Sequence, residues 1–73
     1  MFKLYRVYSG WDEDDGFFIG YYHTKEQAEI AMANLAKEQM EVYYLQVTTI
    51  SDNAWVYDYG SHTRFYKIIK EEE

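Results

Sequence analysis

Apolar and polar side chains alternate at the start of the chain, which is typical of a β-strand. Residues 2–9 read FKLYRVYS, and Leu4 shares one face of this run with Arg6 and Tyr8. Residues 17–22 read FFIGYY and form a second strand that is apolar on both faces. A glycine within a strand marks a bulge or a close backbone approach, so we expect one at Gly20. The two strands and the loop between them predict a hairpin.

A helical period replaces this alternation after residue 23. Thr24 and Gln27 fit the capping box, in which Thr24 accepts the amide of Gln27 and the Gln27 side chain reaches back to Thr24. Helix-forming residues then continue to about Met40. At about 100° per residue, one face gathers small and apolar residues, namely Ala28, Ala31, Met32, Leu35 and Ala36. Ile30 lies among the charged residues of the opposite face and does not fit this amphipathic pattern.

The second half of the chain returns to β-type patterns. Residues 42–50, VYYLQVTTI, are dense in β-branched and aromatic residues and form the clearest predicted strand. A turn cluster follows at residues 51–53, and short alternating runs occupy residues 55–59 and 63–69. Gly60 fits the first central position of a type II′ turn, and a longer loop is the alternative. The order β-β-α-β-β predicts an α+β fold, with a mostly antiparallel sheet of up to five strands and one α-helix packed on one face.

Length and composition limit the architecture further. The chain has 73 residues, so we expect a single domain over residues 1–73, with a frayed tail at residues 71–73. A hydrophobic fraction of 48% and an aromatic fraction of 21% argue against disorder. The absence of cysteine excludes disulfides and thiolate metal sites. No signal-peptide pattern and no membrane-spanning run are present, so we expect a cytoplasmic protein without a membrane partner.

The segment GYYHTKEQAE at residues 20–29 resembles a recurring segment of small bacterial and phage proteins of unknown function. In those proteins a strand that ends in Gly-x-Tyr leads into Ser/Thr-x-Glu-x-Ala-Glu and a short helix that closes on a leucine, here Leu35. The strands KLYRVYS and YYLQVTTI, with Trp55 a few residues later, are similar as well, so the resemblance covers roughly residues 3–57. It implies the same strand, strand, capped helix and strand order. It implies no activity and no site residues.

Four consecutive acids between Gly10 and Gly16 form the most charged segment of the chain. An EF-hand loop that began at the first acid would need glycine at its sixth position and glutamate at its twelfth, where this chain has Phe17 and His23. We therefore expect no metal site, but a solvated loop or an electrostatic contact surface. No nucleophile elbow and no glycine-rich phosphate loop occur, so we expect a protein that is not an enzyme and binds no cofactor.

Nine tyrosines are the most unusual feature of the composition. One helix covers only one face of a sheet, so the other face must be exposed, paired in a homodimer or docked on a partner. A net charge of −6 argues against nucleic acid, whereas tyrosine and tryptophan provide rigid contact area for protein binding. The candidate protein-binding residues are Trp11, Asp12, Glu13, Asp14, Asp15, Ile30, Tyr57 and Tyr59.

These patterns lead to three competing hypotheses about function. The first is a small acidic protein that binds another protein, in the manner of phage-encoded accessory proteins and inhibitors of host defence enzymes. Some of those inhibitors present carboxylates where a target expects phosphates. The second is a structural homo-oligomer with no separate ligand. The third is a binder of nucleotides or single-stranded nucleic acid, which would need a basic groove that the composition does not supply.

Overall fold

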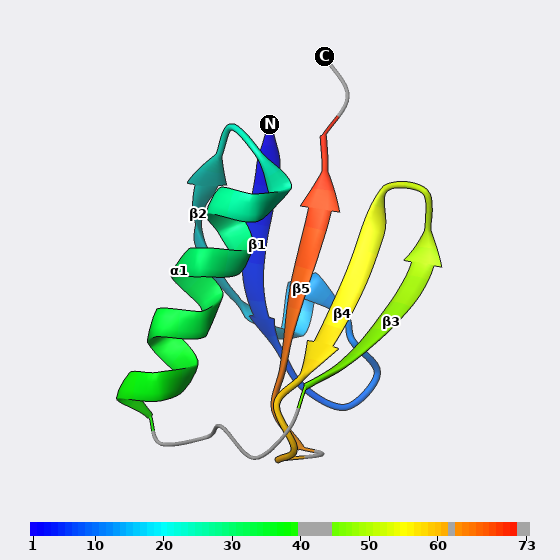
Figure 1. Cartoon of the computed structure of the whole chain (residues 1–73). Helices are drawn as coiled ribbons and strands as arrows, with labels where there is room; N and C mark the ends of the chain where they lie inside the picture. Colours follow the sequence, from blue (N-terminus) through cyan, green and yellow to red (C-terminus); the bar gives the residue numbers. More distant parts are fainter. Residues whose placement is uncertain (40–44, 62, 72–73) are drawn as a thin grey trace.

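The computed structural model describes residues 1–39, 45–61 and 63–71. Five strands and one α-helix form an α+β fold in which the helix packs on one face of an antiparallel sheet (Figure 1), as the sequence predicts. The elements are β1 (Phe2–Val7), the 3₁₀ turn η1 (Glu13–Asp15), β2 (Phe17–Tyr22), α1 (Lys25–Glu38), β3 (Gln46–Ser51), β4 (Ala54–Asp58) and β5 (Phe65–Lys70).

The order of strands across the sheet is β2-β1-β5-β4-β3. Two hairpins, β1–β2 and β3–β4, form the two sides of the sheet, and β5 joins them at its centre. Leu4 of β1 lies opposite Ile68 of β5, and Trp55 of β4 lies opposite the same Ile68 on the other side. The two edge strands are therefore β2 and β3.

The predicted element bounds hold for most of the chain. The predicted bulge is confirmed, because the register of β1 and β2 shifts between Leu4, which lies opposite Gly20, and Tyr5, which lies opposite Phe18. The connection from β4 to β5 is a longer loop over residues 59–64 and not a two-residue turn. The predicted end of the helix at Met40 lies outside the described residues. So do the predicted start of the third strand at residues 42–44 and residues 72–73 of the expected tail.

Thr24 caps α1 as predicted, because its Oγ1 accepts the backbone N–H of Gln27 at 3.1 Å. The reciprocal half of the box differs from the expectation. Gln27 Oε1 accepts the backbone N–H of His23 at 3.2 Å, one residue before the cap. The side chain therefore ties the helix to the end of the preceding turn, so the helix start is fixed by two hydrogen bonds.

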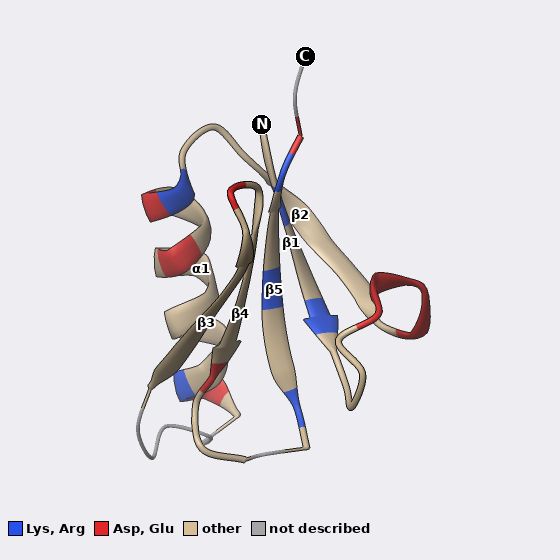
Figure 2. Cartoon of the chain, turned by 90° about the vertical axis from the view of Figure 1, so that its right-hand side faces the viewer, with Lys and Arg blue, Asp and Glu red and all other residues tan. Residues whose placement is uncertain are grey.

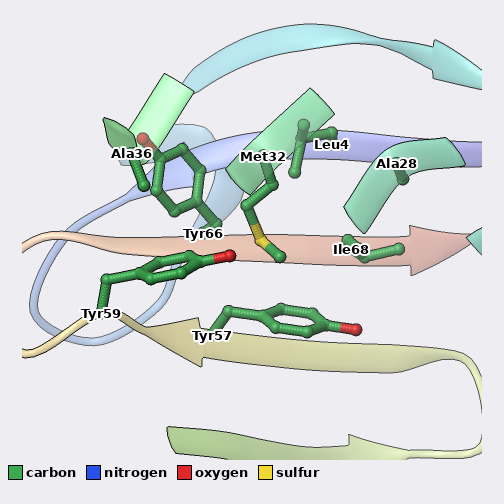
Figure 3. Packing of buried hydrophobic residues seen from close by; sticks show 8 residues of the cluster. All are labelled: Leu4, Ala28, Met32, Ala36, Tyr57, Tyr59, Tyr66 and Ile68. Atoms are coloured by element: carbon green, nitrogen blue, oxygen red, sulfur yellow. The ribbon is translucent and has the colours of Figure 1, made fainter. Parts of the chain in front are cut away.

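The core lies between α1 and the central strands of the sheet (Figure 3). Alanines at one face of α1 let the helix lie close to the sheet, and Met32 reaches down between the tyrosines of β4 and β5 (Figure 3). Ala31 and Leu35, expected on the buried face, pack against this cluster while partly exposed. The buried cluster comprises Leu4, Ala28, Met32, Ala36, Tyr57, Tyr59, Tyr66 and Ile68.

Candidate functional site

The candidate residues from the sequence lie on two separate surfaces. Ile30, Tyr57 and Tyr59 meet along a groove beside α1. Residues 11–15 form the connection between β1 and β2, and η1 within it lies on the side of the sheet opposite α1 (Figure 2). The sequence grouped these residues by composition, whereas the fold divides them between the two faces of the sheet.

The groove exists because α1 covers only part of its face of the sheet. The helix packs against β1, β2 and β5, so β3 and β4 extend beyond it (Figure 1). The resulting α1–β3 groove has a volume of about 410 Å³. Its lining residues come from α1, from β4 and the residue after it, and from the residue before β3: Glu26, Glu29, Ile30, Met32, Ala33, Leu45, Tyr57 and Tyr59.

The rim of the groove is apolar and open to solvent. Ile30 on α1 is 63% exposed, and Leu45 on the opposite side is 51% exposed. Val47 of β3, at 46% exposed, pairs with Tyr57 of β4 and so belongs to the same face of the sheet. Two large apolar side chains are therefore left in water at the rim of the groove, and Val47 is a third beside it on the same face of the sheet.

Tyr57 and Tyr59, which the sequence suggests as contact residues, are buried in this structure. Tyr57 is 1% exposed and Tyr59 is 8% exposed, because alternation along the chain turns both side chains toward α1 and the core. Both rings form the floor of the groove. Ile30, whose position contradicts the helical pattern, is exposed at its rim.

The floor of the groove is neutral and its α1 wall is acidic. The Tyr57 hydroxyl donates to Glu29 Oε2 at 2.9 Å, and burial together with this carboxylate raises the pKa of Tyr57 well above its usual 10.0. Burial also raises the pKa of Tyr59, with a smaller contribution from Tyr66. Both hydroxyls therefore keep their protons at neutral pH, and the ionised groups that line the groove are Glu29 and Glu26.

The acidic loop contains an ordered turn held by a lysine from β5. Asp12 caps the 3₁₀ turn by accepting the backbone N–H of Asp14 at 2.9 Å. Lys67 Nζ donates to Glu13 Oε2 at 2.8 Å and to the backbone carbonyl of Trp11 at 2.9 Å. The hydrogen bond from Lys67 lowers the pKa of Glu13. Lys67 lies 54 positions away from Glu13 in the sequence, so the residues of the loop alone do not reveal this partner.

Trp11 is anchored within its own domain. Its backbone adopts a left-handed conformation with φ 57°, directly after Gly10 at φ 94°, and its N–H donates to the carbonyl of Tyr8. The indole packs edge-on against Phe65 at 6.0 Å. Trp11 is therefore half-buried rather than a free contact residue, while Asp12 and the two acids after Glu13 are exposed.

Exposed aromatic residues on the edge strand β2 were missed as candidates. Phe17 is 65% exposed, Phe18 is 49% exposed and Tyr21 is 55% exposed. The Phe18 ring contacts both Tyr5 and Tyr21 in edge-on geometry, at 5.4 Å and 5.0 Å. The sequence signal was the apolar character of both faces of this strand, since a strand with one buried face needs only one apolar face.

Among residues 1–39, 45–61 and 63–71, no three or more His, Asp or Glu side chains come together in a group that could hold a metal ion. Within the same residues, no helix is long and apolar enough to cross a membrane. No family model, no curated protein sequence and no solved structure matches this chain.

Proposed function

We propose that this protein is not an enzyme and acts by binding another protein through the α1–β3 groove. The observation that supports the proposal is the exposure of Ile30 and Leu45 at the rim of one groove, with the exposed Val47 next to its floor residue Tyr57 on the same face of the sheet. Burial of apolar area stabilises a complex by about 25 cal/mol per Å², so covering these side chains would make the free energy of binding more favourable. Contiguous exposed apolar patches on small proteins generally mark interaction sites.

The charge of the chain favours a basic partner. Glu26 and Glu29 line the α1 wall of the groove, and the chain carries a net charge of −6. Complementary charge speeds encounter and suppresses wrong partners more than it adds affinity. The narrower form of the proposal is inhibition of a basic target such as a host defence enzyme, with the exposed acids Asp12, Asp14 and Asp15 as a second contact.

A structural homo-oligomer is the second candidate, because the unpaired edge strands β2 and β3 each offer a place for a second copy. Light scattering of the pure protein over a range of concentrations separates the two candidates. A dimer that covers the groove would favour the homo-oligomer, and a monomer with an open groove would favour a different partner.

Site-specific photocrosslinking tests the proposed function directly. A photoreactive amino acid at position 30 should crosslink to a distinct protein in lysate of the native host, whereas one at position 38 should not. Glu38 is a matched control because it is exposed on α1, does not line the groove and is not separated from Ile30 by three or four residues. Excess unlabelled protein should compete for the crosslink, and excess unlabelled Ile30→Asp should not. Equal crosslinking at the two positions, or competition by Ile30→Asp, would refute the proposal.

A further inference from the structure

We propose that the occupant of the α1–β3 groove is an amphipathic α-helix of the partner protein, with basic residues on the side that faces α1. This inference rests on the proposed function and specifies the partner of the same groove. It is carried by three observations: the half-covered sheet, the stripe of residues along the flank of α1, and the acidic charge of that flank.

The part of the sheet that α1 leaves uncovered lies where a second helix of the same layer would pack. A helix packs on a sheet as one layer, and neighbouring helices in that layer lie about 8–10 Å apart. Here α1 forms this layer over β1, β2 and β5 and reaches as far as Tyr57 of β4, and the exposed Leu45 and Val47 mark the side toward β3 that α1 leaves uncovered. A second helix beside α1 would complete the layer and bury the exposed side chains of the rim.

The flank of α1 that faces the groove is suited to contact with another helix. Glu26, Ile30 and Ala33 follow each other at spacings of four and three residues, which places them on one stripe. The stripe spans about 10 Å, or two helical turns, at a rise of about 1.5 Å per residue. Ala33 allows a close approach, and Ile30 provides a large apolar side chain next to it. A partner helix of three or more turns would cover the whole stripe.

The charges favour a basic helix and argue against a second copy of this chain. Glu26 is exposed and Glu29 uses one carboxylate oxygen for Tyr57, so both remain available to lysine or arginine of a partner. The only α-helix in the described residues is α1, whose own apolar face is already buried through Ala28, Met32 and Ala36. A second α1 would bring three glutamates and two lysines to the two acids of the groove, so it complements their charge less well than a basic helix does.

An extended segment added to the open edge of β3 would explain less of the surface. Strand addition continues the sheet beside β3 in the plane of the sheet. Ile30 projects from the helix layer and would stay exposed in such a complex. A helix in the groove covers Ile30, Leu45 and Val47 together, so the observations favour the helix.

Selection from two displayed libraries tests this inference. One library randomises the outer face of one helix in a small three-helix scaffold, and the other consists of unstructured peptides of about nine residues, the length that pairs along a strand. Binders should come from the helical library and carry lysine or arginine beside an apolar stripe. The inference would be overturned by binders that come from the unstructured library or that carry acidic residues. It would also be overturned by binders whose affinity is the same for Ile30→Asp and for the unchanged protein.

Matched variants then locate the selected helix on this protein. Ile30→Asp should weaken its binding by about tenfold or more, as for a central apolar contact, and Glu38→Ala, at an exposed position of α1 outside the groove, by less than about twofold. Glu26→Lys should weaken binding and reduce its salt dependence, while Glu38→Lys, which changes an exposed acid outside the groove, should have little effect. Equal effects within either pair would place the helix elsewhere and overturn the inference.

The two proposals fail in different ways. Absence of the specific crosslink from position 30 refutes the function itself. A specific crosslink combined with binders from the unstructured library alone refutes only the helix. A concentration-dependent dimer that Ile30→Asp dissociates assigns the groove to a second copy and also overturns the helix.

Discussion

Replacing Lys67 with methionine should detach the acidic loop, residues 11–15, from the face of the sheet opposite α1. Lys67 joins β5 to two points of the β1–β2 connection, the carboxylate of Glu13 and the carbonyl of Trp11. Methionine keeps the unbranched aliphatic part of the side chain and removes the ammonium group. Lys67→Met therefore tests the two hydrogen bonds with little change in apolar packing.

The size of the effect follows from the surroundings of the two bonds. The Lys67 side chain is 13% exposed, so the bond from a charged donor to the Trp11 carbonyl is worth about 1.5–3 kcal/mol. The Glu13 side chain is 40% exposed, and solvent screening reduces its ion pair to about 0.2–1 kcal/mol. Lys67→Met should therefore lower the free energy of unfolding by about 2–3 kcal/mol, which corresponds to a fall in Tm of about 10–20 °C for a domain of this size.

Urea denaturation at neutral pH, followed by tryptophan fluorescence, measures this difference. Lys70→Met is the matched control, because Lys70 is exposed on the same strand, and its effect should stay within about 0.5 kcal/mol. Glu13→Gln should lose only the ion-pair part. Because the Lys67 bond lowers the pKa of Glu13 from 4.5, that part is present above pH 4.5 and is lost as the pH falls further. Equal stabilities of Lys67→Met and Lys70→Met would refute the proposed anchoring of the loop.

Three further predictions concern the fold. Gly16→Ala should destabilise the protein by about 1–3 kcal/mol or more, because a Cβ there would lie 2.1 Å from a backbone carbonyl oxygen of β1. Gly20→Ala should be tolerated, because the nearest atom to its Cβ would lie at 3.4 Å. Equal denaturation midpoints of the two variants would contradict this. Thr24→Ala should cost about 1 kcal/mol in thermal unfolding and Thr24→Ser much less, and equal losses would remove the role of the cap hydroxyl. In an alkaline absorbance titration Tyr57 and Tyr59 should keep their protons above pH 10.0 as long as the protein is folded. Because the unfolded chain releases these protons near pH 10.0, stability should fall as the pH rises above that value; ionisation of both side chains near pH 10 without unfolding would contradict it.

Features that depend on residues close together in the sequence could be predicted from the sequence. The capping residue Thr24, the small residues on the buried face of α1 and the bulge at Gly20 all follow from local rules, and the structure confirms each of them. The exposed position of Ile30 was also predictable, because a helical period assigns every residue to a face. Local periodicity therefore identified the elements and one residue of the groove.

Features that depend on the order of the strands in the sheet could not be predicted from the sequence. Nothing near β5 in the sequence indicates that it lies between β1 and β4, so the pairing of Lys67 with Glu13 could not be anticipated. The same order decides which part of the sheet α1 covers, and thereby buries Tyr57 and Tyr59 beneath the groove. Periodicity shows that alternate residues share a face, but only the arrangement of the strands shows what covers that face.

The central position of β5 has a consequence for folding during synthesis. The two hairpins that form the sides of the sheet pair with each other only through this strand, which is the last of the five to be synthesised. An isolated two-stranded hairpin is marginally stable at best. The contacts between β1 and β5 join residues that are far apart in sequence, and such long-range closure slows folding. The four earlier strands of the nascent chain should therefore stay unfolded and sensitive to proteases until β5 has left the ribosome, and the sheet should then form in a single cooperative step.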